Sequence, residues 1–197
     1  LYVPAMFPPV SKEKLTDLAA MDYCQRASVI LRKYLEDFSI AEIDAAVAAA
    51  YGGGKFDAPE VAPLKQLDDQ TYVMELFHGP TLAFKDMALQ LLPHLITLSA
   101  KKNGEEREIS ILVATSGDTG KAALEGFKDV PGTKMVVFYP QDGVSQMQKR
   151  QMTTQEGGNV AVCAIEGNFD DAQTGVKKIF TDQAVVEKLA QHSMIFS

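Results

Sequence analysis

Apolar residues recur every three or four positions along the first fifty residues, which is the spacing of one face of an α-helix. Ser11 is placed to cap the first helix, and the apolar positions continue from there to Leu35. A further helix is expected to begin after Ser39 and to end at Gly52-Gly53-Gly54. Lys55 follows these glycines, but no strand pattern precedes them, so they favour a helix stop over a phosphate-binding loop.

Beyond Pro63 the pattern changes to short apolar runs that alternate with helical stretches. The runs predict strands at 71–77, 109–115, 134–139 and 160–165. The stretches between them predict helices at 84–101, 119–129, 144–156 and 170–190. Strands that alternate with helices predict an α/β fold, a parallel sheet with flanking helices, here preceded by a helical N-terminal segment. In such sheets, ligands bind where the loops leave the carboxyl ends of the strands.

Composition narrows the possible partners. The chain has 197 residues, 46% of them hydrophobic, and a formal net charge of −7. An acidic balance disfavours a surface for nucleic acid or anionic membranes, but leaves room for a local pocket that binds a small anion. The longest apolar run, residues 87–98, is too short to span a bilayer, and the N-terminus has no signal-peptide pattern. We therefore expect a cytoplasmic protein.

Cysteine and histidine usage gives no indication of a metal site. Cys24 and Cys163 lie far apart and lack CxxC spacing, which is typical of reduced thiols in the cytosol. The three histidines, His78, His94 and His192, are scattered. We therefore predict no disulfide and no bound metal.

One loop carries a candidate catalytic lysine. Residues 78–86 read His-Gly-Pro-Thr-Leu-Ala-Phe-Lys-Asp, with a stiff Gly-Pro turn near the start. Thr81 and Lys85 are four residues apart and would share one face if a helix had begun. Partial burial and the helix N-terminus would lower the pKa of Lys85, as Schiff-base chemistry requires. The alternative is that Lys85 is paired with Asp86 or with solvent.

A second loop offers an anion cradle. The strand at 109–115 leads into Thr115-Ser116-Gly117-Asp118-Thr119-Gly120, and a helix follows. Hydroxyls and backbone N–H groups at a helix N-terminus suit a carboxylate or phosphate. A Walker loop is excluded for two reasons. Only two residues separate Gly117 from Gly120-Lys121, and Ala122 stands where that motif has Ser or Thr. The alternative is a plain turn in which Asp118 or Thr119 caps the helix.

Two later loops follow the same layout with weaker signals. One precedes the helix that carries Lys149 and Arg150, which more often form a solvated face than an anion site. The other contains Asn168 and leads into Asp170 and Asp171, which suit the first turn of a helix.

Taken together, the two strongest loops resemble one family. His-Gly-Pro-Thr-x-Ala-Phe-Lys-Asp, followed about thirty residues on by Ala-Thr-Ser-Gly-Asp-Thr-Gly, is similar to the threonine synthases. These are pyridoxal 5'-phosphate (PLP) enzymes of the tryptophan-synthase-β type, also called fold type II. The likeness runs over essentially the whole chain and includes the opening Leu-Tyr-Val-Pro, Tyr-Pro-x-x-Gly-Val-Ser and Glu-Gly-Asn-Phe-Asp-Asp.

The resemblance implies roles for particular residues. Lys85 would be catalytic and would carry PLP as a Schiff base, with Phe84 and Asp118 also binding the cofactor. No metal is implied. The residues implied to bind substrate are Thr115, Ser116, Gly117, Thr119, Lys149 and Asn168.

The implied reaction converts O-phosphohomoserine and water to threonine and phosphate by γ-elimination and β-addition of water. Many serine and threonine dehydratases of this fold type have Asn where Asp118 stands, so Asp118 favours a threonine synthase. The alternatives are a dehydratase-like enzyme and a non-catalytic module that binds an anion.

Parts of the family pattern are missing. No glycine-rich Thr-Gly-Asn-Phe-Gly loop for the PLP phosphate is found, and the sequence stops at Ser197, before the segment for the pyridine-nitrogen partner. The resemblance therefore implies a chain incomplete at both ends and inactive alone. Its expected parts are a helical segment, 1–58; the first strand and helix of the large PLP domain, 59–104; and a small α/β substrate domain, 105–197. Oligomeric state is left open.

Overall fold

The computed structural model describes residues 3–196, so the ends at Leu1, Tyr2 and Ser197 lie outside the described residues. The chain divides into two compact units, Leu1–His78 (unit 1) and Gly79–Ser197 (unit 2). Each unit is described by itself. The expected functional parts 1–58, 59–104 and 105–197 stay a prediction.

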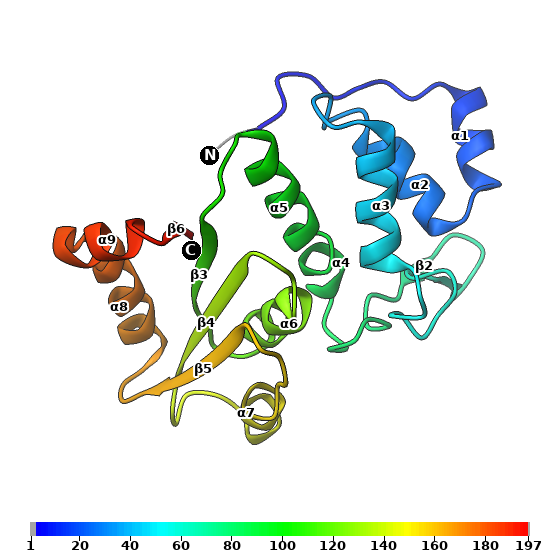
Figure 1. Cartoon of the computed structure of the whole chain (residues 1–197). Coiled ribbons are helices and arrows are strands. Elements are labelled where there is room, and N and C mark those ends of the chain that lie inside the picture. Colours follow the sequence, from blue (N-terminus) through cyan, green and yellow to red (C-terminus); the bar gives the residue numbers. More distant parts are fainter. Residues whose placement is uncertain (1–2, 197) are drawn as a thin grey trace. The chain divides into compact units, whose positions relative to one another are not determined.

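Unit 1 begins with three helices (Figure 1). The start of each is set by a capping side chain. As predicted, Ser11 caps the first helix by accepting the N–H of Lys14. The apolar pattern to Leu35 is not one helix, because Asp22 and Gln25 form a reciprocal capping box that starts a new one. The predicted Ser39 start and the glycine stop after residue 51 are both confirmed. The helices are α1 (Lys12–Ala19), α2 (Tyr23–Leu31) and α3 (Ile40–Tyr51).

A short antiparallel hairpin follows in unit 1, formed by β1 (Leu64–Gln66) and β2 (Tyr72–Met74). The prediction that residues 71–77 form a strand of the parallel sheet is therefore wrong. The carboxylate of Asp68 accepts the N–H groups of Gln70 and Thr71, which closes a tight turn. This turn pairs the segment with its own neighbour in the sequence instead of with a distant strand.

Unit 1 ends at a histidine held between two carboxylates. In His78, Nδ1 lies 2.5 Å from Asp57 Oδ1 and Nε2 lies 2.9 Å from Glu75 Oε2. The ring also stacks on Phe77 at 4.6 Å between centroids. The hydrogen bonds to Glu75 and then Asp57 raise the pKa of His78 above its ordinary value of 6.5.

This arrangement predicts that the stability of unit 1 depends on pH. Below pH 6.5 His78 is charged whether folded or unfolded, so its stabilising contribution is fully present; the contribution is lost as pH rises through the higher folded-state pKa. Titration of the His78 ring by NMR should give a pKa above 6.5, and Glu75→Gln should lower it more than Asp57→Asn does. A pKa of His78 at or below 6.5 in the wild-type protein would contradict the hydrogen bonds from His78 to Glu75 and Asp57.

Unit 2 is built on a parallel four-stranded sheet with the order β5-β4-β3-β6 (Figure 1). The α/β fold predicted from the sequence is confirmed, with three of its strands close to their expected bounds. The fourth strand, β6, was not predicted because it is a short apolar run with no periodic flank. The strands are β3 (Glu108–Ala114), β4 (Thr133–Pro140), β5 (Val160–Ile165) and β6 (Ser193–Phe196).

Two of the predicted helices of unit 2 are each broken in two. The helix expected at 84–101 breaks before Pro93, because proline suits the first turn of a helix and not its interior. The helix expected at 170–190 breaks at Asp182, whose carboxylate accepts the N–H groups of Ala184 and Val185. The helices are α4 (Asp86–Leu89), α5 (Leu92–Lys102), α6 (Asp118–Phe127), α7 (Gln146–Thr153), α8 (Phe169–Thr181) and α9 (Gln183–Ala190).

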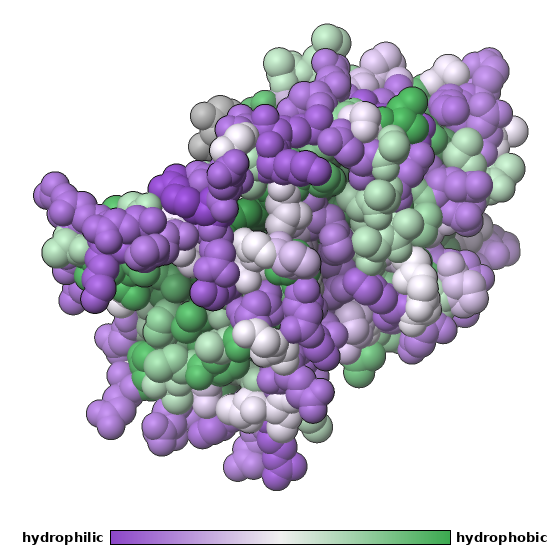
Figure 2. Space-filling view, viewed as in Figure 1, coloured by the Kyte–Doolittle hydropathy of each residue, from purple (hydrophilic) through white to green (hydrophobic). Residues whose placement is uncertain are grey.

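The two faces of the sheet are covered unequally. Alternate β4 side chains on one face, including Met135 and Val137, are buried with Leu124 and Phe127 of α6. On the other face, α8 contacts β3 and β4 but leaves a cavity of about 320 Å³ beside Phe138. Figure 2 shows apolar side chains gathered at the lower left, over α8 and β5. The face covered by α6 is therefore the more closely packed of the two.

Across residues 3–196, no helix is both long enough and apolar enough to cross a membrane.

Candidate functional site

Lys85 lies immediately before the first residue of α4. Because the helix begins at Asp86, the prediction that Thr81 and Lys85 share a helix face is wrong. The Lys85 side chain is half-buried, and its Nζ lies 4.3 Å from the centroid of the exposed Phe84 ring. Asp86 turns inward to Thr81 and does not pair with Lys85. Among residues 3–196, no carboxylate lies within ion-pair distance of the Lys85 amine.

The loop at 115–120 alternates between buried and exposed residues. Thr115 is buried, and its hydroxyl accepts the N–H groups of Gly117 at 3.0 Å and Gly120 at 2.9 Å. Ser116, Asp118 and Thr119 are exposed, and within the described part of the chain their backbone N–H groups donate to no acceptor. The loop thus presents three donors to solvent. The loop offers fewer donors than the sequence suggested, because Thr115 takes the other two, and anion binding by this loop stays a prediction.

Gly117 caps α6, so the alternative in which Asp118 or Thr119 caps that helix is wrong. Gly117 has φ 149°, and a Cβ there would lie 2.3 Å from Nε2 of Gln148. The backbone conformation therefore requires glycine at this position, and a side chain there would also displace the Gln148 amide.

Gln148 holds the candidate cofactor residue Asp118 and was not singled out from the sequence. Its Nε2 donates to Asp118 Oδ1 at 2.8 Å, while its Oε1 accepts the N–H of Ser145 at 3.1 Å. The capping-box position, three residues after Ser145, was the signal available. Because α7 supplies Gln148, the orientation of Asp118 depends on the loop and helix after β4.

Lys149 and Asn168 are not brought to the other site residues by any contact in the described residues. Nζ of Lys149 donates to the carbonyl of Gln141 at 3.4 Å, beside a cavity of about 500 Å³ that Arg150 also lines. The Asn168 side chain caps α8 by accepting the N–H of Asp171. Their roles in substrate binding stay predictions.

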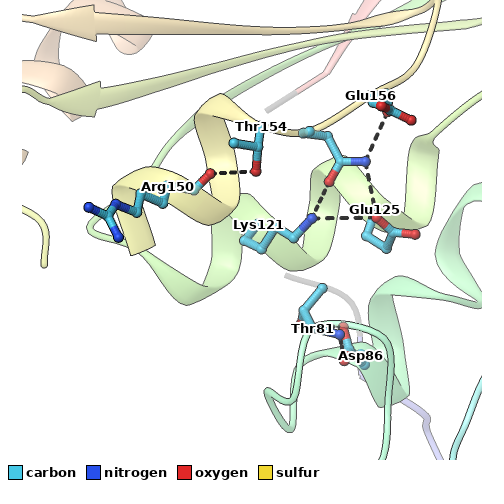
Figure 3. A network of polar contacts seen from close by, with 8 residues as sticks. Thr81, Asp86, Lys121, Glu125, Arg150, Thr154 and Glu156 are labelled. Carbon is cyan, nitrogen blue, oxygen red and sulfur yellow. Dashed lines mark hydrogen bonds and ion pairs between the residues drawn. The ribbon is translucent and has the colours of Figure 1, made fainter. Parts of the chain in front are cut away.

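The elements that carry Lys85 and the 115–120 loop pack directly together. A Cβ on Gly126 of α6 would lie only 2.0 Å from the carbonyl oxygen of Leu89 in α4. Close by, the Glu125 carboxylate accepts from Lys121 at 3.5 Å and from Gln155 at 3.0 Å (Figure 3). The lysine loop and the 115–120 loop are therefore both joined to helices that pack against each other, α4 and α6.

These residues suit PLP by their chemistry. A half-buried primary amine without a carboxylate partner can bond an aldehyde, and exposed N–H groups at a helix N-terminus suit anionic oxygens. A parallel α/β sheet with this pair of loops has the architecture predicted above, that of the PLP enzymes of fold type II.

The comparisons with known proteins show which family within that class the chain resembles. Residues 1–51 match the family model described as the threonine synthase N terminus. The chain is 43% identical to the threonine synthase of Pseudomonas aeruginosa over 95% of the chain and 39% of that protein. The resemblance to the N-terminal portion of threonine synthases, predicted from the two loops, is confirmed.

Solved structures show the same resemblance. The chain is similar to a PLP-bound threonine synthase from Brucella melitensis, with a TM-score of 0.89, 38% identity, and coverage of 100% of this chain and 41% of that one. The threonine synthase from yeast gives a TM-score of 0.84 and 34% identity over 93% of this chain and 38% of that one. The chain thus spans about two fifths of the length of each of these three relatives.

Proposed function

We propose that this chain is the lysine-bearing part of a PLP-dependent threonine synthase. The observation that carries the proposal is the Lys85 amine, half-buried beside Phe84 and without a carboxylate partner among the described residues. The substrate is O-phosphohomoserine, and the products are threonine and phosphate. Similarity to threonine synthases over nearly the whole chain supports this reaction over that of a dehydratase.

The residues divide the work by their chemistry. PLP, when bound, supplies the electron-withdrawing ring that stabilises negative charge at the substrate's α-carbon. Lys85 would hold PLP covalently through Nζ, and the same amine, when free, would accept the α-proton of the substrate. The Phe84 ring covers one side of the amine and restricts water there.

The cradle binds and orients. The exposed N–H groups of Ser116, Asp118 and Thr119 donate to anionic oxygens of the substrate. Ionised Asp118 cannot donate from its side chain, so it acts as an acceptor whose direction Gln148 fixes. Thr115 and Gly117 contribute by holding the loop, since both are buried.

The covalent step can be tested on the chain itself. With PLP at limiting concentration followed by borohydride reduction, peptide mass spectrometry should find the cofactor on Lys85 in preference to Lys177, an exposed lysine on α8. Equal modification of Lys85 and Lys177 would contradict the proposal, because it would show that Lys85 is no more than an accessible amine.

The reaction can be tested in a hybrid, in which this chain replaces the matching 39% of the Pseudomonas aeruginosa enzyme. We expect the hybrid to release phosphate from O-phosphohomoserine and to release no ammonia from threonine above background. Ammonia release without phosphate release would assign a dehydratase instead.

A further inference from the structure

A buried carboxylate lies directly beside Lys85 in the sequence. Asp86 is 0% exposed, and both of its oxygens bind Thr81: Oδ2 accepts the backbone N–H at 2.8 Å and Oδ1 accepts the hydroxyl at 2.6 Å. Burial raises the pKa of Asp86, while the two Thr81 donors oppose that rise. Figure 3 shows the two side chains pointing toward one another. One carboxylate thus ties together the two ends of the segment that leads into Lys85.

The segment that Asp86 closes is tight. A Cβ on Gly79 would lie 2.5 Å from Asp86 Oδ2, so the backbone passes directly over the carboxylate. Leu82 adopts φ 62°, a left-handed conformation that costs a non-glycine residue energy. The carboxylate is therefore the group around which the turn from Gly79 to Asp86 is wrapped, and it compensates for the strain at Leu82.

The neighbouring charged groups do not compete with Thr81 for Asp86. Glu125 on α6 is the other carboxylate that acts on Asp86, and Glu125 is itself hydrogen-bonded by Lys121 and Gln155. Successive residues at a helix start point about 100° apart, because 3.6 residues make a turn. With the Asp86 side chain buried toward Thr81, the side chain of Lys85 is directed away from the turn and toward Phe84.

We propose that Asp86 is a positioning residue for Lys85, and that its carboxylate acts through Thr81 to hold the Lys85 amine in the place where it reacts. The proposal rests on the function proposed above and adds to it a residue that contacts neither cofactor nor substrate. Loss of the Asp86–Thr81 contacts lets the turn relax. The Lys85 amine then stays accessible but no longer reacts with PLP in preference to other lysines.

The test uses the same trapping experiment, with the ratio of Lys85 to Lys177 modification as the readout. Asp86→Asn keeps one accepting oxygen but turns the other into an amide donor that faces a Thr81 donor, so we expect the ratio to fall at least about tenfold, as misplacement of a reacting group does. Thr81→Val keeps the size of the side chain but loses the hydroxyl, and should lower the ratio in the same direction. Thr81→Ser keeps both donors and should preserve the ratio.

A matched control separates positioning from general stability. Asn159 is a part-buried polar residue distant from Asp86 in the sequence. Its Nδ2 donates to the Phe127 carbonyl at 2.8 Å. Asn159→Ala should destabilise unit 2 in urea unfolding and leave the labelling ratio unchanged. A fall in the ratio for Asn159→Ala equal to that for Asp86→Asn would overturn the proposal.

The remaining outcomes are also decisive. An unchanged ratio in Asp86→Asn overturns the positioning role while leaving the proposed function intact. If Asp86→Asn does not fold, the comparison of Thr81→Val with Thr81→Ser decides, and equal ratios in those two variants overturn the role. Wild-type protein with no preference for Lys85 overturns the proposed function itself, which distinguishes the two failures.

Discussion

Replacing Lys85 by alanine will lower phosphate release from O-phosphohomoserine in the hybrid enzyme by at least about a thousandfold. The amine is proposed both to hold the cofactor and to carry the α-proton, and loss of a positioned acid–base group alone costs ~10²- to 10⁴-fold. The rate is measured as phosphate released per enzyme at saturating cofactor, so weaker binding of the cofactor does not account for the loss.

Two companion variants sharpen this result. Lys85→Arg keeps the positive charge and length but should be equally inactive, because a guanidinium is not deprotonated in proteins and cannot bond an aldehyde. Lys177→Ala removes an exposed lysine from α8 and should leave the rate unchanged. Activity of Lys85→Ala within about tenfold of wild type would move the chemistry to another residue.

Replacing Gly126 by alanine will destabilise unit 2 by about 3 kcal/mol, at the upper end of the usual cost of overpacking. The new Cβ would lie 2.0 Å from the Leu89 carbonyl oxygen, and that neighbour is backbone, which cannot rotate away. Relief requires α4 to separate from α6, so the lysine loop moves with it. The free energy of unfolding from urea titrations followed by circular dichroism gives the stability.

Gly175 supplies the matched control, since it also lies within a helix. A Cβ there meets nothing within 4 Å, and the residue is exposed on α8. Gly175→Ala should therefore stabilise the protein by up to about 1 kcal/mol through helix propensity alone. A Gly126→Ala variant that is as stable as wild type or more stable, as expected for Gly175→Ala, would show that the α4–α6 contact is not as close as described.

The elements that were predicted well are those whose signal is local. The Ser39 helix start, its glycine stop and the strand at 160–165 each depend on residues within a few positions of one another. The elements that were missed depend on distant partners or on a competing local bond. β6 is a strand only because β3 offers an edge, and residues 71–77 were diverted into a hairpin by the turn at Asp68.

The candidate site divides in the same way. Two sequence segments, residues 78–86 and 114–120, were sufficient to single out Lys85 and the 115–120 loop. Each is a specific run of residues that resembles one enzyme family. What the Thr115 hydroxyl binds could not be predicted, since it depends on how the loop folds back over its own strand. The contact between Gln148 and Asp118 joins residues thirty positions apart, and no periodic pattern indicates it.

The strand order also sets the sequence in which the protein can fold during synthesis. The hairpin and helices of unit 1 rely on neighbours close in the chain, and such contacts form quickly. In contrast, β3 acquires its second neighbour only when residues 193–196 have left the ribosome. Until then one edge of β3 is exposed, and unpaired edges favour aggregation. Pairing with residues 193–196 therefore protects β3 from edge-to-edge association, and β3 is most open to such association before that segment emerges.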